Sequence, residues 1–450
     1  MNRLLLTAGL GLGLVAALHA RASAQATASF DAGDAVDPIS IVEGPGVKIG
    51  EGTVLHPVFG VETGVVSNVF YEEANANPAG LLRLLAQVGA GSLGKKRLTT
   101  PGAVDENPLT AGENDGREGT ITNEGSFQYR ADLRLSYDFL LSGNDRVTAQ
   151  GGLGAGAMLR GIVNPQSTLS FSFFEDFERI IRATNFESRS DTNRIRNHLN
   201  LRLNFAPKGR TLSARLRYDN TIDYFENNTQ QFANRFQHSF GLRGMWQWLP
   251  VTRIYAEAKI GVFSGLGGDS TKVPSYPLNI EAGIQTLLTL NTTLIVHAGY
   301  TNGFYSAGPS YSAPAVGAQI GYRYSPLGRV TLMYDYVHTD SINANYYRDH
   351  VIRGTLEQGF VPFILSVRPE FHVRQYNGIT VPGAASPARN DVILAVTAGA
   401  HYNFRNWIAA TLDYSFSLVQ SDFTYMPEPG VIDDPSFVRH ELLVGVRAAL

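Results

Sequence analysis

The sequence predicts an all-β fold, a transmembrane antiparallel up-and-down β-barrel of about 18 strands, with 16 as the alternative count. Three observations predict it. Apolar and polar residues alternate with a period of two in one segment after another, as in strands whose two faces meet different surroundings. Short turns alternate along the chain with longer polar loops. The chain also ends inside an alternating segment.

The first 24 residues have the pattern of a cleaved secretory signal peptide. A positive charge at Arg3 precedes an apolar run over residues 4–18, and Ala22-Ser23-Ala24 supplies the small residues of a cleavage site. The run is shorter than the roughly 20 residues that a membrane-spanning helix needs. Because no comparable apolar run follows, we expect residues 25–53 to be a periplasmic segment and residues 54–450 to cross a membrane as strands.

The composition excludes some kinds of site. There is no cysteine, which excludes a disulfide framework, a thiolate metal site and a lipid-modified N-terminal cysteine. The net charge of −3 and the mean hydropathy of −0.09 resemble those of a soluble protein. A barrel with a polar lumen and an apolar outer wall averages to the same value. The 46 glycines, 20 tyrosines and 24 phenylalanines suit strand bends and interfacial girdles.

The segment Phe127–Leu141 shows the alternation most clearly. Its odd-numbered residues are apolar or aromatic, and its even-numbered residues up to Asp138 are polar or charged. Similar patterns return at 199–205, 212–218, 392–404 and 408–418. A soluble β-sandwich or β-propeller is the alternative fold, but neither explains two kinds of connection or a final strand that runs to the last residue.

The connections between these segments indicate an orientation. Short turns are expected at 164–165, 208–210, 250–252, 290–292, 327–329 and 403–406, and longer loops at 182–193, 227–235, 266–276, 380–390 and 422–436. Outer-membrane barrels have short turns in the periplasm and long loops outside the cell. Counting hairpins from Val58 to Leu450 gives 18 strands and leaves both termini in the periplasm.

One segment and one residue depart from the usual pattern. Residues 92–124 are long, charged and rich in Gly, Pro and Asn, yet the count puts them on the periplasmic side. Either these residues form a periplasmic insertion, or the count is wrong by one hairpin between Gly80 and Val163. The final strand alternates up to Leu450, where barrels recognised by the barrel-assembly machinery usually have an aromatic residue.

Charged residues on the polar parity are expected to line the lumen. The main candidates are Arg130, Asp132, Arg134, Arg202, Arg215, Arg217, Asp219, Arg243, Glu257, Lys259, Glu281, Arg368, Glu370 and Arg374. On the same parity lie Asp138, Asp223, Arg323, Asp335, Arg353, Glu357, Asp413, Arg439, Glu441 and Arg447. Because the signs nearly cancel, we expect pairing across the wall and a lumen suited to neutral hydrated cargo. A dedicated ion filter is the alternative.

Aromatic residues gather near the expected strand ends. One group comprises Phe70, Tyr71, Tyr224, Phe225, Phe304, Tyr305, Tyr346 and Tyr347, and the other comprises Trp246, Trp248 and Trp407. An interfacial belt is the expected role. A platform on which sugar rings stack is the alternative, open only to side chains that point inward.

No catalytic or metal-binding constellation is expected. Nucleophile-elbow, HExxH and P-loop spacings are missing from the sequence. His198, His297, His372 and His401 share the inward parity, but near acids they are more simply lining residues than general bases. The acids Glu428, Asp433 and Asp434 could hold Ca²⁺, although a solvated acidic loop is the simpler interpretation.

The stretch Thr53–Glu73 resembles the opening of the β-barrel porin 2 family, whose signature is matched by Ser67-Asn68-Val69-Phe70. Met245–Val262, Gly299–Ser310 and Met333–His350 resemble a subgroup found with exopolysaccharide export genes. The resemblance spans nearly all of the chain after Val54, although each motif is short. It implies an outer-membrane barrel that works with periplasmic polysaccharide-export proteins.

Three functions therefore remain open at this stage. A passive conduit for secreted polysaccharide is the main hypothesis, an uptake porin is the alternative, and a barrel enzyme or surface scaffold is a third. We expect no enzymatic activity and no cofactor. The expected partners are outer-membrane lipid, the barrel-assembly machinery and periplasmic export proteins, and no nucleic acid.

Overall fold

The computed structural model describes residues 46–50, 53–74, 76–91, 126–165, 167–181, 193–207, 211–325, 327–379, 386–428 and 431–450. The expected signal peptide, most of the expected periplasmic segment and residues 92–124 lie outside the described residues. Within the described ranges, no helix is long and apolar enough to cross a membrane.

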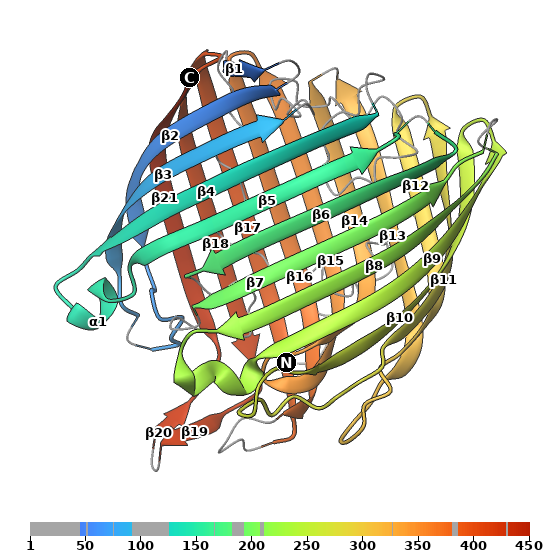
Figure 1. Cartoon of the computed structure of the whole chain (residues 1–450). Helices are drawn as coiled ribbons and strands as arrows, with labels where there is room; N and C mark the ends of the chain where they lie inside the picture. Colours follow the sequence, from blue (N-terminus) through green and yellow to red (C-terminus); the bar gives the residue numbers. More distant parts are fainter. Residues whose placement is uncertain are drawn as a thin grey trace, which may run out of the picture.

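Eighteen antiparallel strands close into a barrel (Figure 1). They are β2 (Thr53–Val66), β3 (Ala79–Gly91), β4 (Phe127–Leu141), β5 (Gly152–Val163), β6 (Leu169–Ile180), β7 (Arg194–Phe205), β8 (Leu212–Phe225), β9 (Arg235–Leu249), β10 (Thr252–Gly265), β11 (Leu278–Thr289), β12 (Thr292–Asn302), β13 (Ser312–Ser325), β14 (Gly328–Asp340), β15 (Ala344–Phe360), β16 (Phe363–Ile379), β17 (Ala388–Arg405), β18 (Ile408–Ser421) and β21 (Phe437–Ala449). Each strand pairs with its chain neighbours, and β21 also pairs with β2, which closes the ring. The count is the predicted 18.

In the part of the chain that the structure describes, five short elements lie outside the ring of barrel strands. They are β1 (Val47–Gly50), α1 (Asp145–Thr148), the 3₁₀ helix η2 (Asn228–Ala233), β19 (Tyr425–Glu428) and β20 (Val431–Asp433). Strand β1 pairs with the beginning of β2, beyond the point where β21 ends. There the backbone N–H of Gly46 donates to the carbonyl of Leu450 at 3.1 Å.

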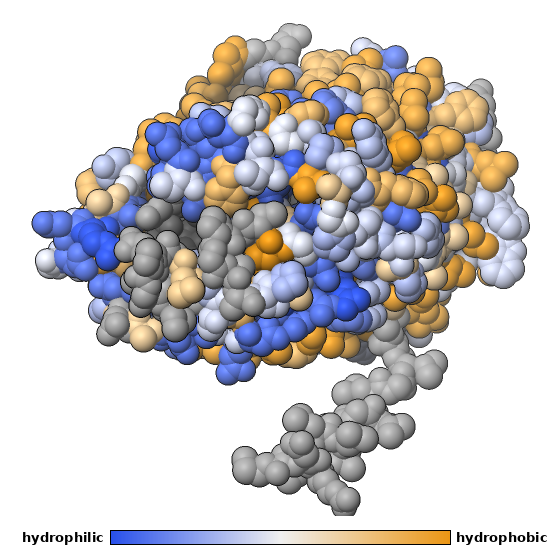
Figure 2. All heavy atoms as spheres, turned by 90° about the horizontal axis from the view of Figure 1, so that it is seen from below, coloured by the Kyte–Doolittle hydropathy of each residue, from blue (hydrophilic) through white to orange (hydrophobic). Residues whose placement is uncertain are grey.

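The barrel is apolar outside and charged inside. In β4, Leu133 is half exposed while its neighbour Asp132 is buried, and the same inversion holds in β21 for Val444 and Glu441. In water, a continuous exposed apolar wall would be an aggregation surface, whereas against lipid it needs no cover. Figure 2 shows the end with the long loops, where hydrophobic residues lie around much of the rim and hydrophilic residues gather over the end itself. The period-two pattern therefore sorts residues between a lipid face and a lumen face.

The two ends of the barrel differ as the sequence predicts. Tight turns link β9 to β10 at 250–251 and β11 to β12 at 290–291, and β14 begins at Gly328 shortly after β13 ends at Ser325. Two turns differ from the prediction. Strand β17 runs on to Arg405, so the expected turn at 403–406 is confined to 406–407, and the turn at Val361-Pro362 was not predicted.

The strand ends that flank residues 92–124 lie at the same end of the barrel as the short turns. Strand β3 ends at Gly91 and β4 begins at Phe127, and both positions lie at that end. No hairpin is miscounted between Gly80 and Val163, because β3, β4 and β5 pair consecutively. The described ends of β3 and β4 therefore agree with the strand count.

The long loops are tied to one another by hydrogen bonds. The Nζ of Lys272, between β10 and β11, donates to the carbonyls of Ser341 at 3.0 Å and Ile342 between β14 and β15. The amide of Asn345 donates to the carbonyls of Ala307 and Pro309, each at 3.1 Å. These contacts fix the loop end of the barrel between β10 and β15.

Candidate functional site: the charged lumen

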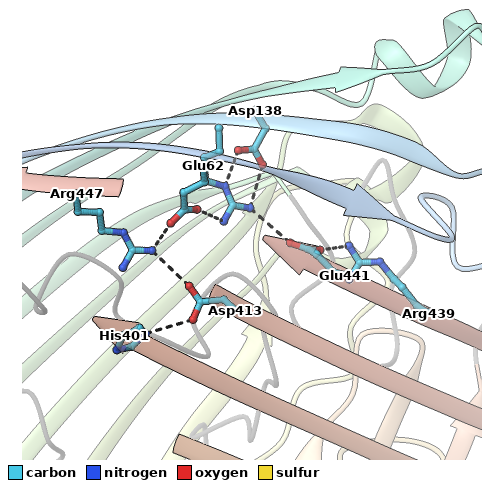
Figure 3. Close-up of polar contacts among 8 residues, drawn as sticks. Glu62, Asp138, His401, Asp413, Arg439, Glu441 and Arg447 are labelled. Carbon is cyan, nitrogen blue, oxygen red and sulfur yellow. Dashed lines mark hydrogen bonds and ion pairs between the residues drawn. The ribbon is translucent and has the colours of Figure 1, made fainter. Parts of the chain in front are cut away.

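The seam where the barrel closes holds a buried network of ion pairs (Figure 3). Glu62 on β2 contacts Arg447 on β21 and Arg83 on β3, whose Nη1 lies 3.5 Å from its Oε2. The Nε of Arg83 lies 2.8 Å from Asp138 Oδ1 on β4, and its Nη2 lies 3.8 Å from Glu441 Oε1. Alternating signs allow each buried charge to be compensated by its neighbours.

The network continues in both directions from the seam. Arg439 Nη2 lies 2.5 Å from Glu441 Oε2. On the other side, Arg447 Nη2 lies 3.7 Å from Asp413 Oδ2 on β18, and His401 Nε2 on β17 lies 3.4 Å from Asp413 Oδ1. Figure 3 shows these groups converging from the first and last strands of the barrel.

A second chain of charges runs across β15 and β16. Arg353 Nε lies 2.5 Å from Glu370 Oε1, and His372 lies between Glu370 at 3.3 Å and Asp349 at 3.0 Å. Arg374 Nη2 reaches Asp349 Oδ2 at 2.8 Å and stacks over the ring of Tyr347, with its guanidinium carbon 4.1 Å from the centroid. The signs again alternate.

A third group of charged side chains lies on β7, β8, β9 and β10. Its positive and negative charges are less evenly matched than those of the first two groups. Asp219 accepts from Arg217 Nε at 2.6 Å and from Asn200 Nδ2 at 2.5 Å. Arg215 Nε donates to a neutral acceptor, Asn204 Oδ1, at 2.7 Å. In the strand register Arg202 lies directly opposite Arg217, so two cations are cross-strand neighbours.

The predicted lumen candidates lie in these three groups, on β4 and on β11. Buried charges include Arg130, Asp132, Asp219, Arg243, Glu257, Lys259, Glu281, Glu370 and Arg374, whereas Arg134, Arg202, Arg215, Arg217 and Arg368 are partly exposed. Glu62, Arg83, Asp349, Arg389 and Asp391 were missed. The first two are lone charges in strands whose Gly and Leu residues fall on both parities, so the alternation there is weak.

The four histidines considered above as catalytic candidates do not form an accessible catalytic group. His372 has the His–Asp contact of a catalytic dyad, but its side chain is fully buried and both ring nitrogens face carboxylates. His198 is more exposed, yet it lies 3.5 Å from Asp219, an acid already held by Arg217. A general base must reach a substrate proton, which a fully enclosed imidazole cannot do.

The aromatic residues divide into two classes. Trp246, Trp248 and Trp407, near the short turns, are about half exposed on the outer wall, as an interfacial belt requires. Phe225 and Tyr347 are buried instead, in clusters under the long loops. The belt prediction thus fails for much of the loop-end group, because the loops pack down on those rings.

Tyr305 illustrates the packing under the loops. Its hydroxyl donates to Asp340 and to the carbonyl of Asn345, the latter at 3.0 Å. Burial, together with the Asp340 carboxylate, raises the pKa of Tyr305 well above its ordinary value. The phenol therefore stays protonated and keeps its role as a donor.

Among the described residues, no group of His, Asp and Glu has a geometry that could hold a metal ion. Of the acids considered for Ca²⁺, Asp434 accepts from the backbone N–H of Ser436 at 2.7 Å. The side chains of Glu428 and Asp433 lie outside the described residues.

The stretch Ser67-Asn68-Val69-Phe70, which resembles a family signature in sequence, has a structural role. The amide of Asn68 donates to the carbonyls of Glu72 at 2.7 Å and Val438 at 3.1 Å, so it ties the β2–β3 loop to β21. Val69 and Phe70 pack in a buried cluster with Leu81 and Val147. The signature stabilises barrel closure and does not contact the lumen charges.

No family model matches the chain, and no curated protein matches it. Solved structures with a similar overall arrangement include OccK2 (OpdF) of Pseudomonas aeruginosa, in complex with glucuronate, at 12% identity and a TM-score of 0.43, covering 89% of this chain and 99% of that chain. OccAB3 of Acinetobacter baumannii has 12% identity and a TM-score of 0.40, with coverage of 88% and 99%. The alcaligin outer-membrane receptor FauA of Bordetella pertussis has 9% identity and a TM-score of 0.37, with coverage of 88% and 76%. The likeness concerns the fold alone, so the function has to be argued from the barrel itself.

Proposed function

We propose that this protein is a passive outer-membrane channel for small hydrated solutes. The observation that carries the proposal is the inversion of the barrel, with apolar side chains exposed outside and charged side chains turned inward. Only the inner face of the barrel then offers a hydrated solute a polar path across the membrane. Barrels of 16 to 18 strands are wide enough for an aqueous channel. Insertion by the barrel-assembly machinery, starting from β21, and an outer-membrane location are part of the same proposal.

The partly exposed charges mark the polar route. The side chains of Arg134, Arg329 and Arg353 are 28%, 33% and 26% exposed, whereas the acids that they contact are more buried. A solute passing along the barrel would meet these guanidinium groups first. The buried networks at the seam and on β15 and β16 would hold the wall rigid around it.

The proposal assigns no catalytic reaction to the residues that line the lumen. A channel spreads its work over many side chains, whereas an enzyme depends on a positioned acid or base whose loss costs roughly 10²-fold or more in rate. His198→Ala, the change at the most accessible inward histidine, should therefore leave transport intact. Loss of function in that variant, with the barrel still inserted, would favour an enzyme.

The direct test is electrical. The refolded full chain, added to a planar lipid bilayer in potassium chloride, should produce stepwise conductance increments of uniform size. A deletion strain should in parallel take up small hydrophilic solutes more slowly. A barrel that inserts and resists heat denaturation in detergent but gives no conductance would contradict the channel proposal.

Export of polysaccharide is the second candidate, supported by the resemblance of Met245–Val262 and Met333–His350 to an export-associated subgroup. In that case deletion should abolish surface polysaccharide while sugar precursors are still made, and periplasmic export proteins should co-purify with the barrel. Normal surface polysaccharide together with slowed solute uptake would exclude this candidate and support the first.

A further inference from the structure

The charges of the barrel strands are segregated, although their overall sum is nearly balanced. Strands β7 to β10 contain nine cationic side chains, namely Arg194, Arg196, Arg202, Arg215, Arg217, Arg235, Arg243, Arg253 and Lys259, and three acidic ones, Asp219, Asp223 and Glu257. The other fourteen barrel strands contain fifteen of each sign. The four strands are consecutive neighbours in the sheet (Figure 1), so the excess forms one continuous surface.

All twelve of these charges lie on the inward parity of their strands. The residues between them are the outward apolar ones, such as Leu203, Leu216 and Leu242, which are exposed to the lipid side. We call the nine inward arginine and lysine side chains of β7 to β10 the cationic wall. From it we infer that the lumen prefers anions, an inference that rests on the proposed channel function and names its solute class.

The acidic side chains of β7 to β10 already form ion pairs with members of the cationic wall. Asp223 lies 3.7 Å from Arg194 and 3.1 Å from Arg235, so two cations share one carboxylate. Glu257 lies 3.5 Å from Arg243. Counted over these four strands alone, nine cations and three acids give a net surplus of six positive charges.

The strand register places positive charges of this surplus opposite one another, which destabilises the sheet. Arg202 lies opposite Arg217, and Arg215 lies opposite Arg243, and like charges directly across a strand pair destabilise a sheet. Places where a sequence breaks such a local rule tend to be functional. The sequence could avoid both pairs with glutamine or serine, as it does at many other inward positions.

Part of the wall is accessible from the lumen. Arg202, Arg215 and Arg217 are partly exposed, whereas Arg194 and Arg235 are buried. Low-dielectric walls focus the field of fixed charges into the water between them, and basic side chains lining a pore select anions. Hydrated anions, small carboxylates among them, would concentrate along β7 to β10, and potassium would be disfavoured there.

The test measures ion selectivity in a potassium chloride gradient across a planar bilayer. The native barrel should give a reversal potential of the sign that reports chloride permeating faster than potassium. In R202Q/R215Q/R217Q, which removes half of the surplus, the permeability ratio should fall at least about twofold toward unity. Raising the salt to 1 M should have a similar effect, because the Debye length shrinks from about 10 Å at 0.1 M to about 3 Å.

A second measurement uses solutes that differ in charge but not in size. With valinomycin present to carry potassium across the lipid, liposomes holding the native barrel should swell faster in potassium gluconate, relative to sorbitol, than liposomes holding R202Q/R215Q/R217Q. The charge-conserving variant R202K/R215K/R217K should behave as the native barrel, which separates lost charge from disturbed packing. Heat-modifiable migration in electrophoresis checks that each variant is folded.

Arg348 provides the matched control, because it is an exposed cation on the outer face of β15. R348Q removes a charge from the lipid side and should leave the reversal potential unchanged. Cation preference in the native barrel, an undiminished ratio in the triple glutamine variant, or an equal change in R348Q would each overturn the inference. Conductance without anion preference would overturn this inference alone, whereas no conductance would overturn the channel function itself.

Discussion

Glu62 and Arg447 show how single residues hold the barrel closed. They come from the first and last strands of the ring, and the side chains of both are only 1% exposed. A buried charge that loses its partner is left without compensation, which is far more costly than the loss of an exposed ion pair. The contacts at the seam therefore matter more for stability than their small number suggests.

Arg447→Gln tests this at the scale of one residue. The free energy of unfolding in lipid, measured by denaturant titration, should fall by roughly 3 kcal/mol, because Glu62 stays buried with only the more distant Arg83 as a partner. Arg405→Gln, an exposed charge next to the β17–β18 turn, should change it by less than about 0.5 kcal/mol. The double variant E62Q/R447Q should recover part of the loss, and an additive loss would show that the pair is not coupled.

At the scale of the strand, alternation decides what each face tolerates. Leu135 on β4 is exposed on the outer wall, and its neighbour Ser136 points inward near the space above Gly154. The two residues lie at almost the same depth in the membrane and differ only in the face that they occupy. Replacement of an inward arginine such as Arg134 would also affect stability, because Asp176 and Glu178 would each lose an ion pair with it.

This pair gives the element-scale prediction. Leu135→Arg should destabilise the inserted barrel by roughly 2 to 4 kcal/mol, because a guanidinium near the bilayer midplane has to be desolvated. Ser136→Arg should have a small effect, since the same group would be hydrated in the lumen. Denaturant titration in lipid vesicles measures both variants, and equal effects on the two faces would contradict a lipid-facing outer wall.

For the whole molecule, the proposed outer-membrane location and the alternation of short turns and long loops together predict that the two ends lie in two compartments. The loop over 422–436 contains the β19–β20 hairpin at the loop end, whereas the segment 92–124 joins β3 to β4 at the turn end. Both are long and polar, so they differ in accessibility only through the side of the membrane that they occupy.

Protease treatment of intact cells tests this orientation. A protease added outside should cleave within 422–436 and spare 92–124, and after the cells are opened both segments should be cut. Mapping of the fragments by mass spectrometry identifies the sites. External cleavage within 92–124 would mean that the barrel is inserted the other way or that this segment reaches the cell surface.

The sequence by itself determined the class of fold, the number of strands and the face that most side chains occupy. Period two is a local property, so Phe127–Leu141 and the final strand could be assigned without knowledge of any neighbour. The cationic excess could also have been found from the sequence, since β7 to β10 are consecutive in the chain. Because positive and negative charges nearly cancel over the whole chain, their sum concealed this local excess.

Only the tertiary structure decided which inward charges meet. Closure brings Glu62 beside Arg447, which no count along the chain predicts, because the register between β2 and β21 depends on how the whole ring closes. The same register sets Arg202 against Arg217 and encloses His372 between two acids. The packing of loops over Phe225 and Tyr347 likewise depends on segments far apart in sequence, so the aromatic belt was predicted too broadly.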